Sequence, residues 1–224
     1  MMTRMIRTGL AAAALLLATG AAPAADLSGP RYRTPDYYAP AYANWTGFYL
    51  GLNAAYGVAR SNWDVQEVRS IPKGALAGVT VGYNLQTGNW LWGMEGDFDW
   101  SGMTGSVGCG VGVTCETKNS WLATARGRIG YAGFNSFVPY ITGGAAFGDI
   151  KATHSALASA SKTKVGWTLG AGIEYAMWSN WTFKLEYLYV DLGTFDCGIA
   201  CSAVTPDNVS FKANLVRAGV NYRF

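Results

Sequence analysis

The sequence predicts an all-β protein, an eight-stranded antiparallel up-and-down transmembrane β-barrel. Three observations lead to this fold: apolar and charged residues alternate within segments, short and long connections alternate between segments, and aromatic residues stand at both ends of the apolar faces. The 224-residue chain holds 29 Gly, 9 Trp, 13 Tyr and 9 Phe, whereas charged residues make up only 14% of it. Such a composition favours strands and tight turns over a helical core.

The first 24 residues are expected to be a cleaved signal peptide for export. Two arginines precede a short apolar core at residues 10–18, and Ala22-Pro23-Ala24 supplies a small–x–small cleavage pattern. The alternative, an uncleaved helical anchor, would need an apolar run about twice as long. Residues 25–44 hold three prolines among scattered tyrosines, which predicts an extended N-terminal periplasmic segment. The barrel is therefore expected to occupy residues 45–224.

Eight segments with turn residues between them are expected to form the strands. No apolar segment after residue 25 approaches the ~20 residues that a membrane-spanning helix needs. The expected strands are about 45–58, 74–86, 90–101, 119–132, 137–150, 163–177, 181–192 and 210–224. Short connections are expected at 87–89, 133–136 and 178–180, and long ones at about 59–73, 102–118, 151–162 and 193–209. Short turns on one side and long loops on the other are typical of an outer-membrane barrel, whereas a soluble sandwich has no reason to sort its connections.

Alternation along the strands assigns one face to lipid and the other to the barrel interior. In the segment 90–101, even positions such as Trp92 and Met94 are large and apolar except for Gly96, whereas odd positions carry the acids. Successive strand residues point to opposite faces, so each such strand has an apolar face and a charged face. The charged residues assigned to the interior are Glu95, Asp97, Arg126, Arg128, Glu174, Lys184, Glu186 and Arg217.

Aromatic residues are expected to form girdles at the two membrane interfaces. Trp90 and Trp100 are ten residues apart, as are Trp121 and Tyr131. Ten residues of a strand tilted by ~40° span about 25 Å, the height of the lipid-facing band of such barrels. The residues assigned to the girdles are Trp45, Trp90, Trp92, Trp100, Trp121, Tyr131, Trp167, Trp181, Tyr222 and Phe224.

The charged interior has two interpretations. It is either a polar pore lining that biases ion passage or a network of internal salt bridges that fills the barrel. Eight strands leave an interior that side chains can fill, and four acids against four bases favour pairing over a ring of one sign. We therefore expect Glu95 or Asp97 to pair with Arg126 or Arg128 on the adjacent strand. Further interior side chains are expected at Tyr49, Asn53 and Asn84.

The chain has four cysteines and one histidine as candidate reactive or metal-binding groups. The cysteines form two close pairs in the sequence, Cys109/Cys115 and Cys197/Cys201, and an exported chain meets conditions in which disulfides form. Four cysteines allow three pairings, of which sequence proximity favours the two local disulfides. A zinc site typically has Cys-x-x-Cys spacing or histidine partners, whereas this chain has neither that spacing nor a histidine other than His154. His154 is expected in a long loop with no base and orienting group beside it. No enzymatic activity, metal or cofactor is therefore predicted.

Short motifs stand at 45–49, 93–97, 126–131, 139–144, 165–168, 170–175, 186–189 and 219–224, after a signal peptide that ends before Ala25-Asp26. In these motifs the chain resembles, from residue 45 to the end, the small porin-like outer-membrane barrels of alphaproteobacteria, the group of the Omp25 and Omp31 proteins of Brucella and their rhizobial relatives. The resemblance implies an outer-membrane location and a membrane domain like those of OmpA and OmpX. The terminal strand ending in Phe224 resembles the signal by which such barrels are handed to their insertion machinery.

The function expected from these features is that of a structural, surface-exposed barrel that contributes to envelope integrity. The alternative is a passive porin for small solutes. The resemblance also implies a third hypothesis, a surface protein that binds heme or takes part in host interaction. Outer-membrane lipids and the barrel insertion machinery are the expected partners. Nucleic acid is not, because the net charge is only +3 and no run of Lys or Arg forms a basic stripe.

Overall fold

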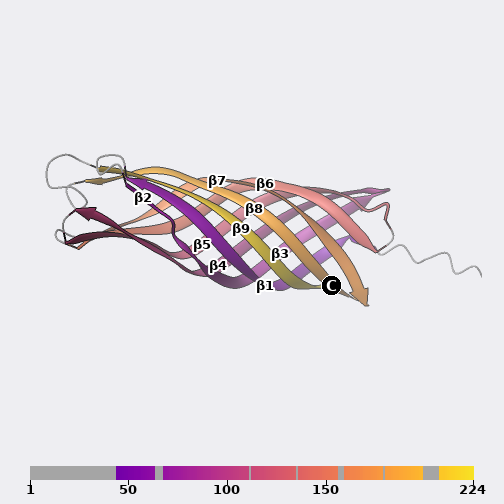
Figure 1. The fold of residues 1–224 in the computed structure, drawn as a ribbon. Coiled ribbons are helices and arrows are strands. Elements are labelled where there is room, and N and C mark those ends of the chain that lie inside the picture. Colours follow the sequence, from indigo (N-terminus) through magenta and orange to yellow (C-terminus); the bar gives the residue numbers. More distant parts are fainter. Residues whose placement is uncertain are drawn as a thin grey trace, which may run out of the picture. The chain divides into compact units, whose positions relative to one another are not determined.

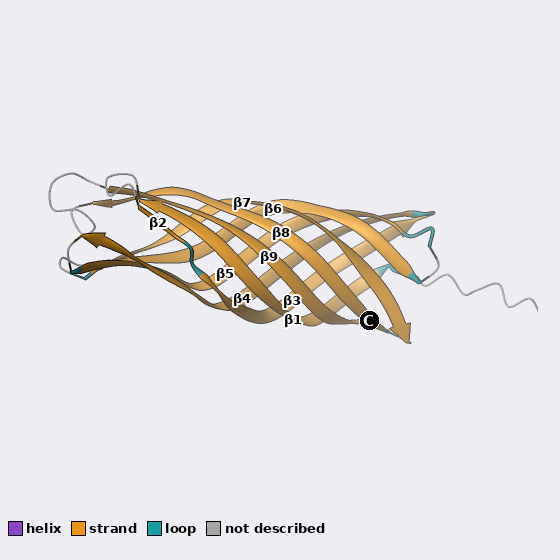
Figure 2. Cartoon of the chain, in the orientation of Figure 1, coloured by secondary structure: helices purple, strands orange, loops and turns teal. Residues whose placement is uncertain are grey.

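The computed structural model describes residues 44–63, 68–110, 112–134, 136–155, 159–178, 180–198 and 207–224. These residues belong to one compact unit, Pro40–Phe224. Their secondary structure is β-strand joined by turns (Figure 2), and they contain no helix long and apolar enough to cross a membrane. The predicted export signal and all but the last residue of the predicted N-terminal segment lie outside the described residues.

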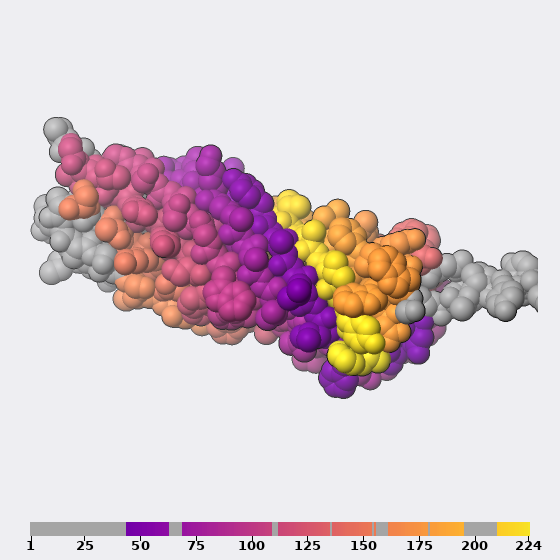
Figure 3. Space-filling model, turned by 90° about the horizontal axis from the view of Figure 1, so that it is seen from below, coloured from indigo at the N-terminus to yellow at the C-terminus, as the bar shows by residue number. Residues whose placement is uncertain are grey.

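The strands form a single antiparallel sheet that closes on itself (Figure 1). Neighbours in the sheet follow chain order, and β1 pairs with β9 to close the ring. Figure 3 shows the first strand, in indigo, lying against the yellow last strand along this seam. Within the described residues the strands are β1 Gly47–Trp63, β2 Val68–Ser70, β3 Lys73–Thr87, β4 Trp90–Gly110, β5 Val113–Tyr131, β6 Phe137–His154, β7 Ser159–Trp178, β8 Trp181–Gly198 and β9 Asp207–Arg223.

Two of these strands, β2 and β3, act as one strand of the barrel. Ser70 faces Ser61 of β1, and Lys73 faces Val58, so the register against β1 continues across the break. Pro72 interrupts the strand because it has no N–H to donate, yet its carbonyl oxygen accepts a hydrogen bond from the Ala59 N–H at 2.7 Å. The predicted eight-stranded up-and-down barrel is confirmed.

The hairpins on one side of the barrel are longer than predicted. β4 continues to Gly110 and β5 begins at Val113, so most of the loop predicted at 102–118 is a paired hairpin. The loops predicted at 59–73, 151–162 and 193–209 are likewise partly strand, and His154 is the last residue of β6 rather than a loop residue. The prediction failed because these extensions leave the apolar band. The backbone ladder continues there, but Thr, Ser and Lys face water and the hydrophobic alternation ends.

The predicted inside–outside assignment is confirmed. On β4, Met94 is 75% exposed and Trp100 63%, whereas Glu95 is 4% exposed. On β9, Val216 is 57% exposed and its neighbour Arg217 is fully buried. The barrel thus turns its apolar face outward and its charged face inward, the reverse of a soluble protein.

Candidate functional site

The interior of the barrel is layered along its axis. Near the two-residue turn 88–89, an apolar cluster of four buried residues closes the interior. The middle is polar and charged. Towards the long hairpins a larger apolar cluster follows, to which Met103, Phe211 and Leu215 belong. The change is visible along β9, where the inward positions run from Asn221 through Arg217 to Leu215 and Phe211. Among the described residues, the charged side chains that are buried lie in the central part of the interior.

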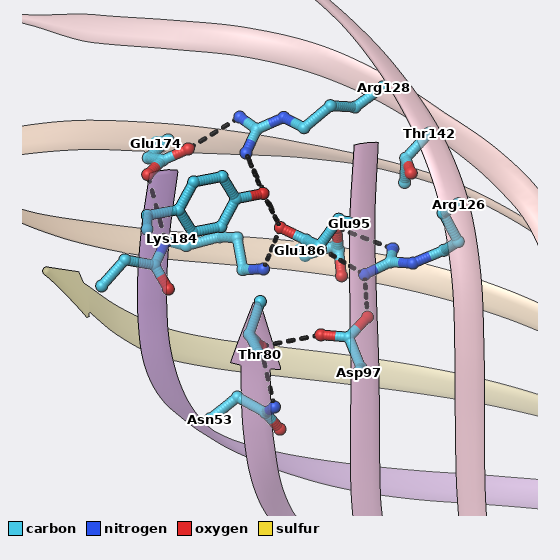
Figure 4. A network of polar contacts seen from close by, with 12 residues as sticks. Asn53, Thr80, Glu95, Asp97, Arg126, Arg128, Thr142, Glu174, Lys184 and Glu186 are labelled. Atoms are coloured by element: carbon cyan, nitrogen blue, oxygen red, sulfur yellow. Dashed lines mark hydrogen bonds and ion pairs between the residues drawn. The ribbon is translucent and has the colours of Figure 1, made fainter. Parts of the chain in front are cut away.

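Arg126 on β5 lies at the centre of the charged layer. Its backbone faces Glu95 of β4 directly. Its guanidinium contacts the Glu95 carboxylate at 2.5 Å, the Asp97 carboxylate at 2.6 Å and the Glu186 carboxylate at 3.0 Å. Figure 4 shows the side chains of Glu95, Asp97 and Glu186 converging on this group. The ion pairing predicted between the third and fourth barrel strands is confirmed.

Lys184 and Arg128 extend this cluster towards the short-turn end. The Lys184 ammonium lies 2.8 Å from the Glu95 carboxylate (Figure 4). The Arg128 guanidinium lies 2.7 Å from the Glu174 carboxylate and 3.7 Å from that of Glu95. Glu174 also accepts a hydrogen bond from the Thr182 hydroxyl at 2.6 Å. Each of these charges therefore has a partner of opposite sign on another strand.

Arg217 on β9 extends the cluster in the opposite direction. Its guanidinium contacts Asp97 at 3.0 Å and forms an ion pair with Asp99. Asp97 also accepts hydrogen bonds from the hydroxyls of Thr80 at 2.7 Å and Thr124 at 2.8 Å. Such complete hydrogen bonding is what a carboxylate buried away from water requires.

Two buried tyrosines complete the network. The Tyr49 hydroxyl donates to Glu95 at 2.7 Å, and the Tyr140 hydroxyl donates to Glu186 at 2.9 Å. Glycine makes room for both rings, because a Cβ at Gly82 would lie 2.3 Å from the Tyr49 ring, and one at Gly172 would lie 2.7 Å from the Tyr140 ring. Each of the eight barrel strands thus contributes a side chain to one connected network, with members at Tyr49, Thr80, Glu95, Arg126, Tyr140, Glu174, Lys184 and Arg217.

The structure places all eight predicted interior charges in this network, and at most 1% of each side chain is exposed. Tyr49, Asn53 and Asn84 are also buried. The predicted list of interior charges did not include Asp99, although the alternation assigned the odd-numbered acids of its segment to the charged face, and Tyr140 was not predicted. The signal was present, since Asp99 shares the odd positions of β4 with the other two acids and Tyr140 alternates with outward-facing residues on β6.

The aromatic residues predicted for the girdles face outward, with one exception. Trp90 faces Tyr131 across β4 and β5, and Trp100 faces Trp121 ten residues further along. Trp45 is the exception, because it is only 1% exposed and belongs to the apolar cluster that closes the short-turn end. It precedes β1, so strand alternation does not orient its side chain. The other predicted girdle residues, Trp92, Trp167, Trp181, Tyr222 and Phe224, are exposed.

Ser155 and Asp149, the hydroxyl and carboxylate nearest to His154 in the sequence, are engaged in local hydrogen bonds. The Ser155 hydroxyl accepts the Thr114 N–H at 3.0 Å, and the Asp149 carboxylate accepts the Ser161 hydroxyl at 2.8 Å. In the part of the chain that the structure describes, no three His, Cys, Asp or Glu side chains gather in a way that could hold a metal ion.

Cys115 is disulfide-bonded and buried in the apolar cluster at the long-hairpin end. The side chains of Cys109, Cys197 and Cys201 lie outside the described ones, so the local pairing stays a prediction. Peptide mapping by mass spectrometry without reduction is expected to find Cys109–Cys115 and Cys197–Cys201 links. Such short closures constrain the unfolded chain little, so reduction should change the free energy of unfolding only slightly. A link between the two pairs would contradict this prediction.

The chain is similar to an outer-membrane family model, to two curated outer-membrane proteins and to one solved surface protein. The family model for the outer membrane protein β-barrel domain matches residues 11–224. The 31 kDa outer-membrane immunogenic protein of Brucella melitensis is 37% identical over 238 residues, covering 96% of this chain and 98% of that protein. The 22 kDa outer membrane protein of Rhizobium leguminosarum is 34% identical, covering 81% and 79%. Neisserial surface protein A has a similar fold, with a TM-score of 0.50 at 14% identity over 80% of this chain and 98% of that one.

Proposed function

This chain belongs to the family of outer membrane β-barrel domain proteins, among Omp25- and Omp31-like members, and from that premise we propose that it is a structural component of the outer membrane whose interior is closed to solutes. The observation that carries the proposal is the buried network to which every barrel strand contributes. In this role the barrel contributes to envelope integrity and presents its long hairpins at the cell surface.

The chemistry of the interior favours a closed barrel over a pore. Pores that select ions are lined by hydrated charges of one sign or by carbonyl oxygens. Here the described interior holds both signs in contact, and an ion crossing it would have to separate pairs such as Arg126 and Glu95. Leaving one member of a buried pair without its partner costs about 3–5 kcal/mol. The apolar clusters at both ends of the charged layer add barriers to water.

Conductance in a planar lipid bilayer tests the proposal. We expect the refolded, unmodified protein to insert without producing discrete, stable channels, because an ion would have to separate paired charges such as Arg126 and Glu95. Insertion itself is verified by the gel-mobility shift of the folded barrel on heating. Large, stable channels whose conductance rises in proportion to salt would overturn the proposal and support the passive porin instead.

A further inference from the structure

Beyond the girdle formed by Trp100 and Trp121, the outer surface of the barrel carries charged side chains. We call this surface, the outward-facing side of the long hairpins, the outer rim. Among its described side chains, basic residues outnumber acidic ones by six to three. The basic residues are Arg60, Arg69, Lys73, Lys118, Lys151 and Lys212, and the acidic residues are Glu116, Asp149 and Asp191.

Three of these lysines lie in one row across neighbouring strands. Lys118 on β5 faces Lys151 on β6 directly, and Thr104 on β4 stands between Lys118 and Lys73 on β3. Like charges directly opposite each other on a sheet destabilise it. Within the described residues, neither Lys118 nor Lys151 forms an ion pair, whereas Lys212 lies 3.3 Å from the Asp191 carboxylate. The two facing lysines thus have no anionic partner among the residues that the structure describes.

A cavity of about 450 Å³ opens beside this row, between β3, β4 and β5. Beside it the strand is interrupted at Pro72, which lies so close to β4 that a Cβ at Gly105 would be 2.5 Å from the Pro72 nitrogen. Its lining combines an ammonium group with hydroxyls and a carboxylate, which suits a sugar that carries phosphate. The lining residues are Ile71, Lys73, Thr104, Gly105, Ser106 and Glu116.

The height of the row above the girdle indicates the source of such a ligand. Lys118 lies three residues beyond Trp121, and Lys73 lies four residues beyond Ala77, the partner of Trp100. At ~3.3 Å per residue and a tilt of ~40°, the row stands roughly 8–10 Å above the aromatic girdle. That is the level of lipid headgroups, with the lipid-facing band directly below to receive acyl chains.

We propose that the outer rim binds a phosphorylated glycolipid of the outer leaflet. Its phosphate contacts Lys118 and Lys151 together with Lys73, and its sugar hydroxyls occupy the cavity beside Glu116. The site lies on the outside of the barrel, so it does not depend on whether the interior conducts.

The chain offers a matched control for the test. Arg60 on β1 faces Lys212 on β9, so this pair is also basic, outward-facing and directly opposed across two strands. Lys212 already has Asp191 as a partner, and neither residue belongs to the row that Lys118 and Lys151 form with Lys73. Lys118→Gln/Lys151→Gln and Arg60→Gln/Lys212→Gln therefore remove the same charge from the same rim.

The experiment measures binding of bisphosphorylated lipid A to the full chain, refolded in phosphatidylcholine nanodiscs, by native mass spectrometry. A cationic side chain near an anionic lipid surface contributes about a fivefold gain in affinity, so Lys118→Gln/Lys151→Gln should weaken binding on the order of 25-fold. Arg60→Gln/Lys212→Gln should weaken it less than about threefold, because this pair is not part of the row and Lys212 is already paired with Asp191. Dephosphorylated lipid A should bind the unmodified protein as weakly as lipid A binds the first variant.

Three results would overturn the proposal. Equal losses in the two variants would mean that only the overall charge of the rim matters. Unchanged binding in Lys118→Gln/Lys151→Gln would place the lipid elsewhere. Tight binding of a soluble sulfated polysaccharide in detergent, lost in the same variant, would mean that the ligand is not a lipid. If the double variant fails to refold, the comparison of lipid A with its dephosphorylated form on the unmodified protein still decides.

Discussion

Replacing Arg126 by alanine is expected to lower the free energy of unfolding by about 3–5 kcal/mol. The guanidinium contacts three carboxylates from two other strands, those of Glu95, Asp97 and Glu186. Its removal leaves these acids buried together with too few cations, and the cost of an uncompensated buried charge is larger than the value of the lost contacts. Urea unfolding of the protein in lipid vesicles, followed by tryptophan fluorescence, measures the change.

Replacing Arg126 together with Arg128 by alanine should also open the interior of the barrel. Removing Arg126 and Arg128 together deletes two large side chains from the charged layer, so we expect discrete channels in a planar bilayer where the unmodified protein gives none.

The control for the unfolding experiment is Arg60→Ala, because this side chain is exposed on the outer rim and its loss should change stability by no more than about 0.5 kcal/mol. A loss of less than 1 kcal/mol for Arg126→Ala would show that the buried ion pairs are not needed for the fold.

The barrel and its charged interior could be predicted from the sequence because lipid enforces a strict rule. Every backbone polar group must be paired within the sheet, and every outward side chain within the band must be apolar. The alternation at Trp92, Met94 and Glu95 therefore assigned both faces of β4 correctly. The pairing of Glu95 with Arg126 followed, because both lie in the interior on neighbouring strands.

The rest of the structure could not be predicted because the rule ends where the lipid ends. The long hairpins cross into water, where polar residues such as Thr104 and Lys118 take the outward positions and no apolar outward face marks a strand. Trp45 resembles a girdle residue in composition, but it lies before β1 and turns into the barrel. The apolar cluster around Phe211 was also missed, since an apolar interior contradicts the inverted pattern that identified the barrel.

Replacing Leu185 by arginine is expected to destabilise the membrane-inserted barrel by about 2–4 kcal/mol. Leu185 faces outward, is 42% exposed and lies midway between Trp181 and Tyr189 on β8, so a charge there stands near the middle of the bilayer. Thr194→Arg is the control on the same strand, because Thr194 is exposed beyond the girdle, where the cost of a charge falls to about 0–1 kcal/mol.

Denaturant titration of the two variants in vesicles, together with the fraction that inserts, gives the comparison. A large loss of stability in Leu185→Arg with little loss in Thr194→Arg would mean that the cost of the charge depends on its depth in the bilayer. Equal losses at the two positions would mean that the cost comes from placing arginine on β8 rather than from lipid, and the assignment of the membrane band between the two aromatic girdles would then be wrong.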